Sequence, residues 1–303
     1  MRPTANEIDK EYCGEPICIS VRFRNSLTVS STDLLVAVLA GVVQGVVEWL
    51  PVSSQGNLSL FLTAVGTSPD IALQLALFLQ LGTTLSAASY YREEISTAAR
   101  SFPRWRPQAA FEEENALTSF ILIACVATGV VGIPLYLFAV DLAGQLSGGL
   151  FISLIGVLLI LTGIVQLASE SVGGTFREQP TLVDACLVGA AQGIAILPGI
   201  SRSGMTTSAL LFRSYDPPVA FRLSFLLAIP ASLGAAALTV AGAGGLPGIS
   251  PSGALVATAT SAVVGYLTID ALMRFVERVA FWMICFGLGG LAIVGGGVVA
   301  VIM

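Results

Sequence analysis

The sequence predicts an all-α polytopic membrane protein with an inverted-topology repeat, in which each half is a re-entrant helical hairpin plus about three transmembrane helices. The first observation is composition, because 55% of the 303 residues are hydrophobic and only 11% are charged. A soluble chain of this length would carry about a quarter charged residues. We therefore expect a multi-pass protein of the cell membrane. The lengths of the apolar runs and an internal repeat are the other two observations.

Composition also excludes several kinds of chemistry. The chain contains no histidine, which excludes a Ser-His-Asp triad, a phosphohistidine intermediate and zinc bound by histidine. Acid–base chemistry must then come from carboxylates, hydroxyls, bound water or a metal ion. No basic tract with interleaved aromatic residues is present, so we expect no nucleic-acid partner.

The chain divides into a polar N-terminal tail, residues 1–31, and a single membrane domain, residues 32–303. The tail carries charges of both signs and lacks the apolar core of a signal peptide. Within the membrane domain, we expect the two repeats at 32–169 and 180–303.

The first half opens with two short apolar arms. Thr32 and Asp33 predict the N-cap of a helix that runs to about residue 49 and ends before Pro51, and a second arm runs from Gly56 to about residue 65. Both arms are shorter than the roughly 20 residues that a bilayer crossing needs, so we expect a re-entrant hairpin. Apolar runs of crossing length follow at 71–91, 117–140 and 150–168, with a polar loop over 92–116.

The second half repeats this order, with short arms at 181–197 and 203–212 and long runs at 219–240, 254–271 and 280–303. At a constant offset of 148 residues (41 to 189), five positions of the first hairpin recur in the second. They are Gly41, Gln44, Gly45, Ser53 and Gly56, matched by Gly189, Gln192, Gly193, Ser201 and Gly204. Because three crossings separate the hairpins, the second should enter from the opposite membrane face, with a site near the midplane.

Arginines in the loops predict the orientation. Loops 92–116, 169–181 and 272–279 all contain arginine and lie on one side of the predicted topology, whereas loops 141–149 and 241–253 contain no Lys or Arg. By the positive-inside rule the arginine-bearing loops are cytoplasmic. The mouth of the first hairpin is then extracytoplasmic.

Glu48 and Arg202 are the only charges deep inside the apolar runs of the two hairpins. Such charges are costly at membrane depth unless they are paired or functional. One interpretation is a structural ion pair that holds the hairpin tips together. The other is a shared anion-binding and reaction centre.

The residues around Arg202 favour the second interpretation. A helix is expected to begin just after a Pro-Gly break, where free backbone N–H groups bind phosphate. Arg202 adds a planar fork for phosphoryl oxygens. Ser201, Ser203 and Thr206 would add hydroxyl donors for the phosphate, and Gly204 is a further candidate for binding the substrate.

The first hairpin supplies complementary groups. Glu48 can act as a base or as a ligand of a divalent cation that bridges phosphate oxygens. Ser53 and Ser54 lie at the break, where a hydroxyl can be a nucleophile or can merely cap the second arm. Gln44 lies one helical turn before Glu48 and can bind substrate or orient a water or a metal ligand.

Two motifs extend these observations to a known family. The first reads Gln44-x-x-x-Glu48-Trp49-Leu50-Pro51-Val52-Ser53-Ser54-x-Gly56, and the second reads Pro198-Gly199-Ile200-Ser201-Arg202-Ser203-Gly204-x-Thr206. Together they resemble the undecaprenyl-diphosphate phosphatase family of the bacitracin-resistance type, and the similarity covers roughly residues 33–303. The resemblance implies an inverted repeat with two re-entrant hairpins.

The resemblance also implies an activity. Members of the family remove the terminal phosphate of a polyprenyl diphosphate, with a divalent cation such as Mg²⁺ or Ca²⁺, and so recycle the carrier lipid for cell-envelope glycan synthesis. The expected partners are the lipid substrate and the bilayer, and a homodimer is possible.

By this resemblance, Glu48 belongs to the acidic motif and Ser54 takes the position of the proposed nucleophile. The phosphate-binding motif contains Ser201, Arg202, Ser203 and Thr206. The family usually has histidine where this chain has Asn57, and asparagine cannot shuttle a proton at neutral pH. We therefore keep Asn57 among the candidate catalytic residues. The alternative function is a lipid-phosphate or anion transporter or binder that has lost hydrolysis.

Overall fold

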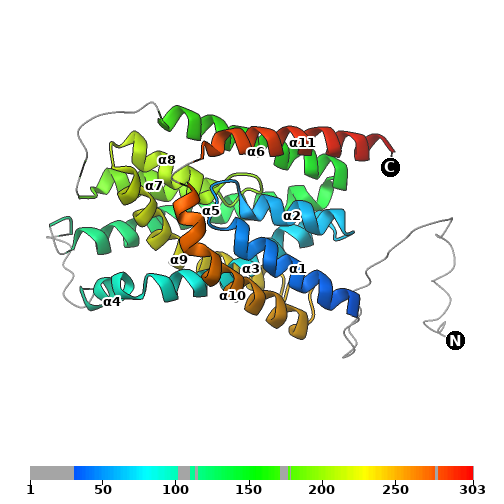
Figure 1. Ribbon diagram of the computed structural model, residues 1–303, viewed down its shortest axis with the longest axis horizontal. Coiled ribbons are helices and arrows are strands. Elements are labelled where there is room, and N and C mark those ends of the chain that lie inside the picture. Colours follow the sequence, from blue (N-terminus) through cyan, green and yellow to red (C-terminus); the bar gives the residue numbers. More distant parts are fainter. Residues whose placement is uncertain are drawn as a thin grey trace.

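The computed structural model describes residues 31–101, 110–112, 115–170, 177, 179–276 and 279–302. The regular elements in these ranges are helices (Figure 1). The predicted tail, residues 1–31, lies outside the described residues except for Ser31. The helices are α1 (Ser31–Val47), α2 (Ser54–Ala64), α3 (Pro69–Tyr90), α4 (Arg92–Ser101), α5 (Ala116–Gln145), α6 (Gly148–Glu170), α7 (Leu182–Ile194), α8 (Arg202–Phe212), α9 (Pro217–Gly242), α10 (Pro251–Val276) and α11 (Phe281–Ile302).

Six of these helices are long and apolar enough to cross a membrane, which confirms the predicted multi-pass membrane fold. They are α3, α5, α6, α9, α10 and α11. The first arms of the two hairpins are shorter, with apolar stretches at Leu34–Val47 in α1 and Leu182–Ile194 in α7. Apart from α4, which lies between α3 and α5, a short helix pair followed by three long helices occurs twice along the described chain.

Two details of the prediction were wrong. The segment 92–116 is not only a loop, because it contains helix α4. Glu93 and Glu94 in its first turn and Arg100 in its last turn complement the helix dipole, and this charged helix has no apolar run to signal it. The first arm ends at Val47 and the second begins at Ser54, so the break between them lies about two residues earlier than expected.

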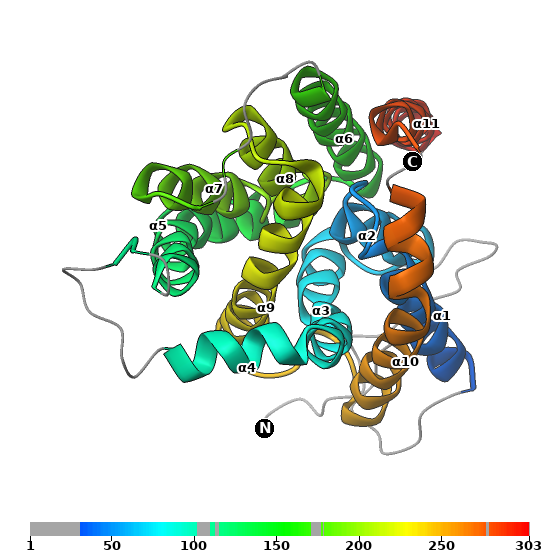
Figure 2. The same ribbon diagram turned by 60° about the vertical axis from the view of Figure 1, so that its left-hand side comes forward.

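The two halves interlock through their hairpins. Helix α1 packs along α10 of the other half, and reciprocally α7 packs along α5. Helices α3 and α9 pack against each other, and α6 lies beside α11 at one edge of the molecule (Figure 2). Each hairpin is thus held by a long helix from the opposite half, which fixes the relative position of the two tips. The opposite membrane orientation of the two halves stays a prediction.

Repeated glycines make these hairpin contacts possible. A Cβ added to Gly45 of α1 would lie 2.8 Å from the Cβ of Val264 in α10, and one added to Gly193 of α7 would lie 2.7 Å from the Cβ of Val131 in α5. Small residues allow helix backbones to approach closely in a membrane. The 148-residue repeat therefore has a packing cause, because the same close approach occurs in both halves.

A polar cluster closes the mouth of the second hairpin. The buried Asp184 of α7 accepts hydrogen bonds from Arg213 Nε at 2.5 Å, Tyr215 OH at 2.8 Å and the backbone N–H of Thr181 at 2.9 Å. Burial, with the Asp184 carboxylate adding to it, raises the pKa of Tyr215, so the phenol stays protonated as a donor. These bonds join the start of α7 to the end of α8.

We predict that Gly45→Ala lowers the thermal stability of the detergent-solubilised protein, because overpacking at a close contact costs about 1–3 kcal/mol. Gly234→Ala in α9 is the matched control, since a Cβ at this position meets nothing within 4 Å. Thermal unfolding followed by intrinsic fluorescence measures both. Equal melting temperatures for the two variants would contradict the proposed packing role.

Candidate active site

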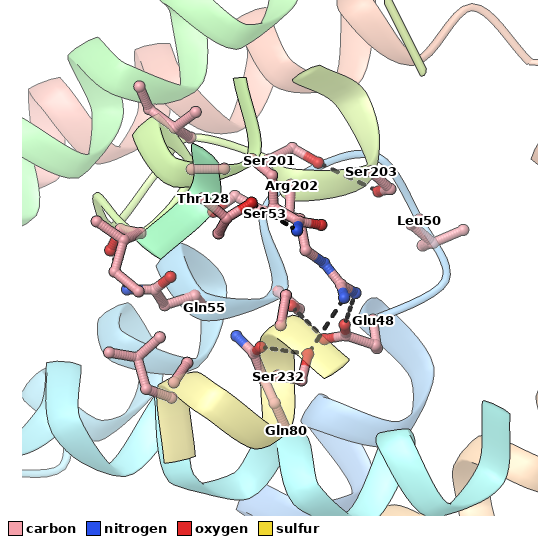
Figure 3. Close-up of a pocket in the computed structure, with 18 residues that line it drawn as sticks. Glu48, Leu50, Ser53, Gln55, Gln80, Thr128, Ser201, Arg202, Ser203 and Ser232 are labelled. Carbon is pink, nitrogen blue, oxygen red and sulfur yellow. Dashed lines mark hydrogen bonds and ion pairs between the residues drawn. The ribbon is translucent and has the colours of Figure 1, made fainter. Parts of the chain in front are cut away.

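The tips of the two hairpins meet at an ion pair. Glu48 follows the last residue of α1, and Arg202 is the first residue of α8. Arg202 Nη2 donates to Glu48 Oε1, and Figure 3 shows the guanidinium pointing from the second tip toward this carboxylate. The Glu48 side chain is 4% exposed and the Arg202 side chain 17%. The structure therefore brings together the two charges that the sequence predicted to meet.

The second oxygen of Glu48 has two further donors. Gln44 Nε2 donates to Glu48 Oε2 at 2.7 Å, and Ser54 Oγ donates to the same oxygen at 2.6 Å. Gln44 lies one helical turn before Glu48, as its spacing predicted. A buried carboxylate is costly unless hydrogen bonds and an opposite charge compensate it, and here three side chains do so.

The other terminal nitrogen of Arg202 leads to two residues that the sequence analysis missed: it bonds to Ser232, and Ser232 bonds to Gln80. Arg202 Nη1 donates to Ser232 Oγ at 3.2 Å, and Ser232 Oγ donates to Gln80 Oε1 at 3.2 Å (Figure 3). Gln80 is in α3 and Ser232 is in α9. The available signal was their polarity within spans that are otherwise apolar.

The structure separates the roles of the two adjacent serines. Ser53 has φ of 60°, a region that few residues other than glycine adopt, and its Oγ accepts hydrogen bonds from Gly56 N at 3.1 Å and Gly199 N at 3.2 Å. Ser53 therefore caps α2 and binds the other tip. Ser54 instead donates its hydroxyl to Glu48, and its predicted role as the nucleophile stays a prediction.

The second tip has a matching cap. Ser201 Oγ accepts from Gly204 N at 3.1 Å and lies 3.4 Å from Ser203 Oγ. Gly199 has φ of 102°, and a Cβ there would lie 2.5 Å from the carbonyl oxygen of Ile155 in α6. Only glycine fits this position. The first turn of α8 is thus held with its N–H groups at the end that carries Arg202.

Four predicted site residues are absent from the cavity wall, and one of them, Gln44, reaches the site through its bond to Glu48. Asn57 Nδ2 donates to the carbonyl oxygens of Val52 at 2.8 Å and Ser53 at 2.9 Å. Thr206 Oγ1 donates to Arg202 O at 2.9 Å, and Gly204 N is bonded to Ser201. These contacts shape the two tips. The catalytic role of Asn57 and the substrate-binding roles of Gln44, Gly204 and Thr206 stay predictions.

The ion pair lies in a cavity of about 50 Å³ between the tips. A buried water needs about 10–15 Å³ of cavity volume, so this cavity holds a few waters. Because Arg202 is bound to Glu48, an anion can bind the same guanidinium N–H groups only by displacing that carboxylate. Its polar wall consists of Glu48, Ser53, Ser54, Gln55, Gln80, Thr128, Gln192, Ser201, Arg202, Ser203 and Ser232.

Two repeat-related glutamines carry unused acceptors. Gln44 Oε1 and Gln192 Oε1 are buried and have no hydrogen-bond partner among the described residues. Gln192 Nε2 donates to Thr128 Oγ1 at 3.1 Å, and Gln192 lines the cavity with Glu48. Its free oxygen can accept from a bound water or contact a cation that enters with a ligand.

A resident metal site does not fit the described residues. They contain no cluster of three or more His, Cys, Asp or Glu side chains that could hold an ion. Glu48 is the one carboxylate in the cavity wall, and its oxygens already accept bonds from Arg202, Gln44 and Ser54. One carboxylate and neutral amides suit a cation that arrives with its own anionic ligand.

Comparison with known proteins identifies the family. The family described as "Bacitracin resistance protein BacA" matches residues 37–291. The chain belongs to the BacA family. It is 49% identical over 268 residues to a protein named undecaprenyl-diphosphatase from Haloarcula marismortui, covering 88% of this chain and 98% of that relative.

Two further relatives with the same name extend this result. The protein from Methanococcoides burtonii is 39% identical over 262 residues, covering 85% of this chain and 96% of the relative. The protein from Saccharolobus solfataricus is 37% identical over 273 residues, covering 87% and 95%. The BacA match includes both hairpins, α1–α2 from residue 37 onward and all of α7–α8.

We predict that Ser53→Ala lowers thermal stability by about 1–2 kcal/mol, because it removes a helix cap and the acceptor for Gly199 N. Ser54→Ala is the matched control, since Ser54 donates only to Glu48 among the described residues. Denaturant unfolding in mixed micelles measures the difference. A more destabilising effect of Ser54→Ala would reverse the roles assigned to the two serines.

Proposed function

We propose that this chain is an integral membrane phosphatase that hydrolyses the terminal phosphate of an undecaprenyl-type polyprenyl diphosphate, and so recycles the lipid carrier for cell-envelope glycan synthesis. The observation that carries the proposal is a single buried carboxylate in contact with both a hydroxyl and a guanidinium. Ser54 Oγ lies 2.6 Å from Glu48 Oε2, and Arg202 binds the other oxygen. The name undecaprenyl-diphosphatase of the BacA relatives supports the substrate class.

In this proposal the diphosphate takes the place of Glu48 at Arg202. The planar guanidinium binds two phosphoryl oxygens, and the N–H groups of the first turn of α8 bind others. Ser201 and Ser203 line the same wall and add hydroxyl donors. These groups lower the energy of the charge that develops on the transferred phosphoryl group.

Glu48 and Ser54 perform the chemical step. Glu48 accepts the proton of Ser54 while Oγ attacks the terminal phosphorus and the bond to the bridging oxygen breaks. Polyprenyl monophosphate leaves, and water then releases phosphate from the serine. In the alternative form of this step, Glu48 activates a water molecule, which attacks the terminal phosphorus in place of Ser54. Asn57 is proposed to support it by fixing the backbone of the first tip.

The divalent cation, Mg²⁺ or Ca²⁺, is proposed to enter with the diphosphate as part of the substrate. It would neutralise phosphate charge, and Glu48 and the free oxygen of Gln192 are the protein oxygens available to it in the cavity. Gln44 orients Glu48 through its amide.

The direct test is phosphate release from C15–C55 polyprenyl diphosphates by purified protein in detergent, with Mg²⁺, Ca²⁺ or EDTA. We expect release that depends on a divalent cation and stops with EDTA. Asn57→His is tested alongside, to measure whether the histidine usual in the family raises the rate. No release from the unaltered protein under any of these conditions would reject the phosphatase proposal.

We predict that Arg202→Lys lowers kcat/KM at least about 100-fold, because a lysine cannot form the planar fork that stabilises the transition state. Arg274→Lys is the matched control, since Arg274 forms an exposed ion pair with Asp270 at 2.5 Å. Steady-state phosphate release measures both variants. Activity within about threefold of the unaltered protein, a difference of roughly 0.65 kcal/mol in transition-state stabilisation, would show that Arg202 takes no part in the reaction.

Ser54→Ala distinguishes the two forms of the chemical step. If Ser54 is the nucleophile, we expect kcat to fall at least about a thousand-fold, as for other nucleophile deletions. Retention of activity within about tenfold of the unaltered protein would assign the attack to water activated by Glu48.

A further inference from the structure

A second and much larger cavity lies on the opposite side of the hairpin tips. Its volume is about 560 Å³, within the range of small-molecule sites, against about 50 Å³ at the ion pair. Pro51 and Gly204 from the two tips form part of its wall, while their neighbours Leu50 and Ser203 line the active site. The tips are therefore a thin partition between the two cavities.

The positions of the wall residues place the large cavity at one end of the molecule. Arg222 of α9 lines the large cavity and Ser232 of the same helix lines the small one, so the two lie roughly 15 Å apart along the helix axis. Gln166 of α6 and Phe281 of α11 also line the large cavity. This is the end where the loops 169–181 and 272–279 contain arginine.

The wall of the large cavity contains both polar and apolar side chains. Its buried hydroxyls belong to Ser169, Thr207 and Ser208, and Ser169 Oγ donates to Ser208 Oγ at 3.1 Å. Its apolar residues are Leu211, Pro217, Pro218, Phe221, Val279 and Phe281. An amphiphile with a small polar head suits such a wall.

Among the described residues of the cavity wall, Arg222 is the one that carries a positive charge. Its side chain is exposed, and it forms no ion pair with a described residue. Burial raises the pKa of Tyr91 to about 12, and the Arg222 guanidinium opposes that shift, which places the positive charge near the phenol in the same wall. Glu170 adds one carboxylate to the wall.

These features favour a monophosphate over a diphosphate. A single guanidinium binds one phosphate group through two parallel bonds. Helix α9 begins with Pro217 and Pro218, which lack backbone N–H groups, so its first turn cannot supply the donors that the start of α8 offers. Glu170 also disfavours a more highly charged head group.

We propose that the large cavity binds an isoprenoid monophosphate, with the phosphate on Arg222 and the first isoprene units against Phe221 and Phe281. The choice of ligand rests on the proposed function, since an isoprenoid monophosphate is the lipid product of the proposed hydrolysis. The cavity would then hold the lipid phosphate at the end of the molecule with the arginine-bearing loops, and the hairpin tips would separate it from the active site.

The test uses full-length Arg202→Ala protein in detergent, so that the active-site anchor is absent, and farnesyl phosphate as the probe in calorimetric titration. We expect binding to persist in Arg202→Ala. Adding Arg222→Gln should weaken it at least about tenfold, as for loss of a charge-assisted hydrogen bond. Adding Arg274→Gln, the matched surface control, should leave it unchanged.

Two further probes separate the parts of the ligand. Inorganic phosphate and farnesol should each bind at least about tenfold more weakly than farnesyl phosphate, because each lacks one half of the amphiphile. Glu170→Gln should strengthen the binding of farnesyl phosphate. This variant gains affinity, so its result does not depend on whether Arg222→Gln folds.

Several outcomes would overturn the proposal. Loss of binding in Arg202→Ala alone would place the ligand in the active site. Equal affinity in Arg222→Gln and Arg274→Gln, or binding of farnesol as tight as that of farnesyl phosphate, would remove phosphate recognition from the large cavity. Hydrolysis is measured separately on the unaltered protein, so its absence together with intact binding would reject the phosphatase alone.

Discussion

The buried pair of Glu48 and Arg202 is the interaction on which the rest of the structure depends. The two residues are 154 positions apart and come from different hairpins. Removing one member of a buried pair leaves an uncompensated charge, at a typical cost of about 3–5 kcal/mol. The halves must therefore place their tips in register. The reciprocal packing of α1 on α10 and α7 on α5 does this.

Contacts between the tips preserve that register without charges. Ser53 Oγ accepts from Gly199 N at 3.2 Å, and Gln55 Nε2 donates to Ile196 O at 2.9 Å. Gln166 of α6, which lines the large cavity, donates from its Nε2 to Pro51 O at a distance of 2.5 Å. The tips thus combine a hydrogen-bonded frame with one ion pair. In the proposed function, a substrate anion replaces the carboxylate of that pair while the frame stays in place.

The sequence predicted the parts of this arrangement that leave a linear signal. Six long apolar runs predicted the spans, and two isolated charges in short apolar arms predicted the meeting of Glu48 and Arg202. The different roles of Ser53 and Ser54 could not be read from the sequence, because the backbone angle at Ser53 decides which hydroxyl faces the carboxylate. Ser232 was missed because its contact depends on how α9 packs against α3.

The presence or absence of a linear signal also explains why α4 was missed and why the repeated glycines were found without their structural cause. A charged helix has no apolar run to mark it, so segment 92–116 was interpreted as a loop. The repeated glycines were recognised from spacing alone. Their cause is the close contact of each hairpin with a helix of the other half, which only the structure supplies.

The most direct measurement is the affinity of a non-hydrolysable farnesyl diphosphonate for the unaltered protein and for Glu48→Gln, both in EDTA. If the ligand replaces Glu48 at Arg202, the variant should bind the analogue more tightly, because a competing negative charge is gone. Its turnover of farnesyl diphosphate, measured separately with a divalent cation, should be lost. Weaker binding by Glu48→Gln would contradict the claim that a substrate anion replaces Glu48 at Arg202.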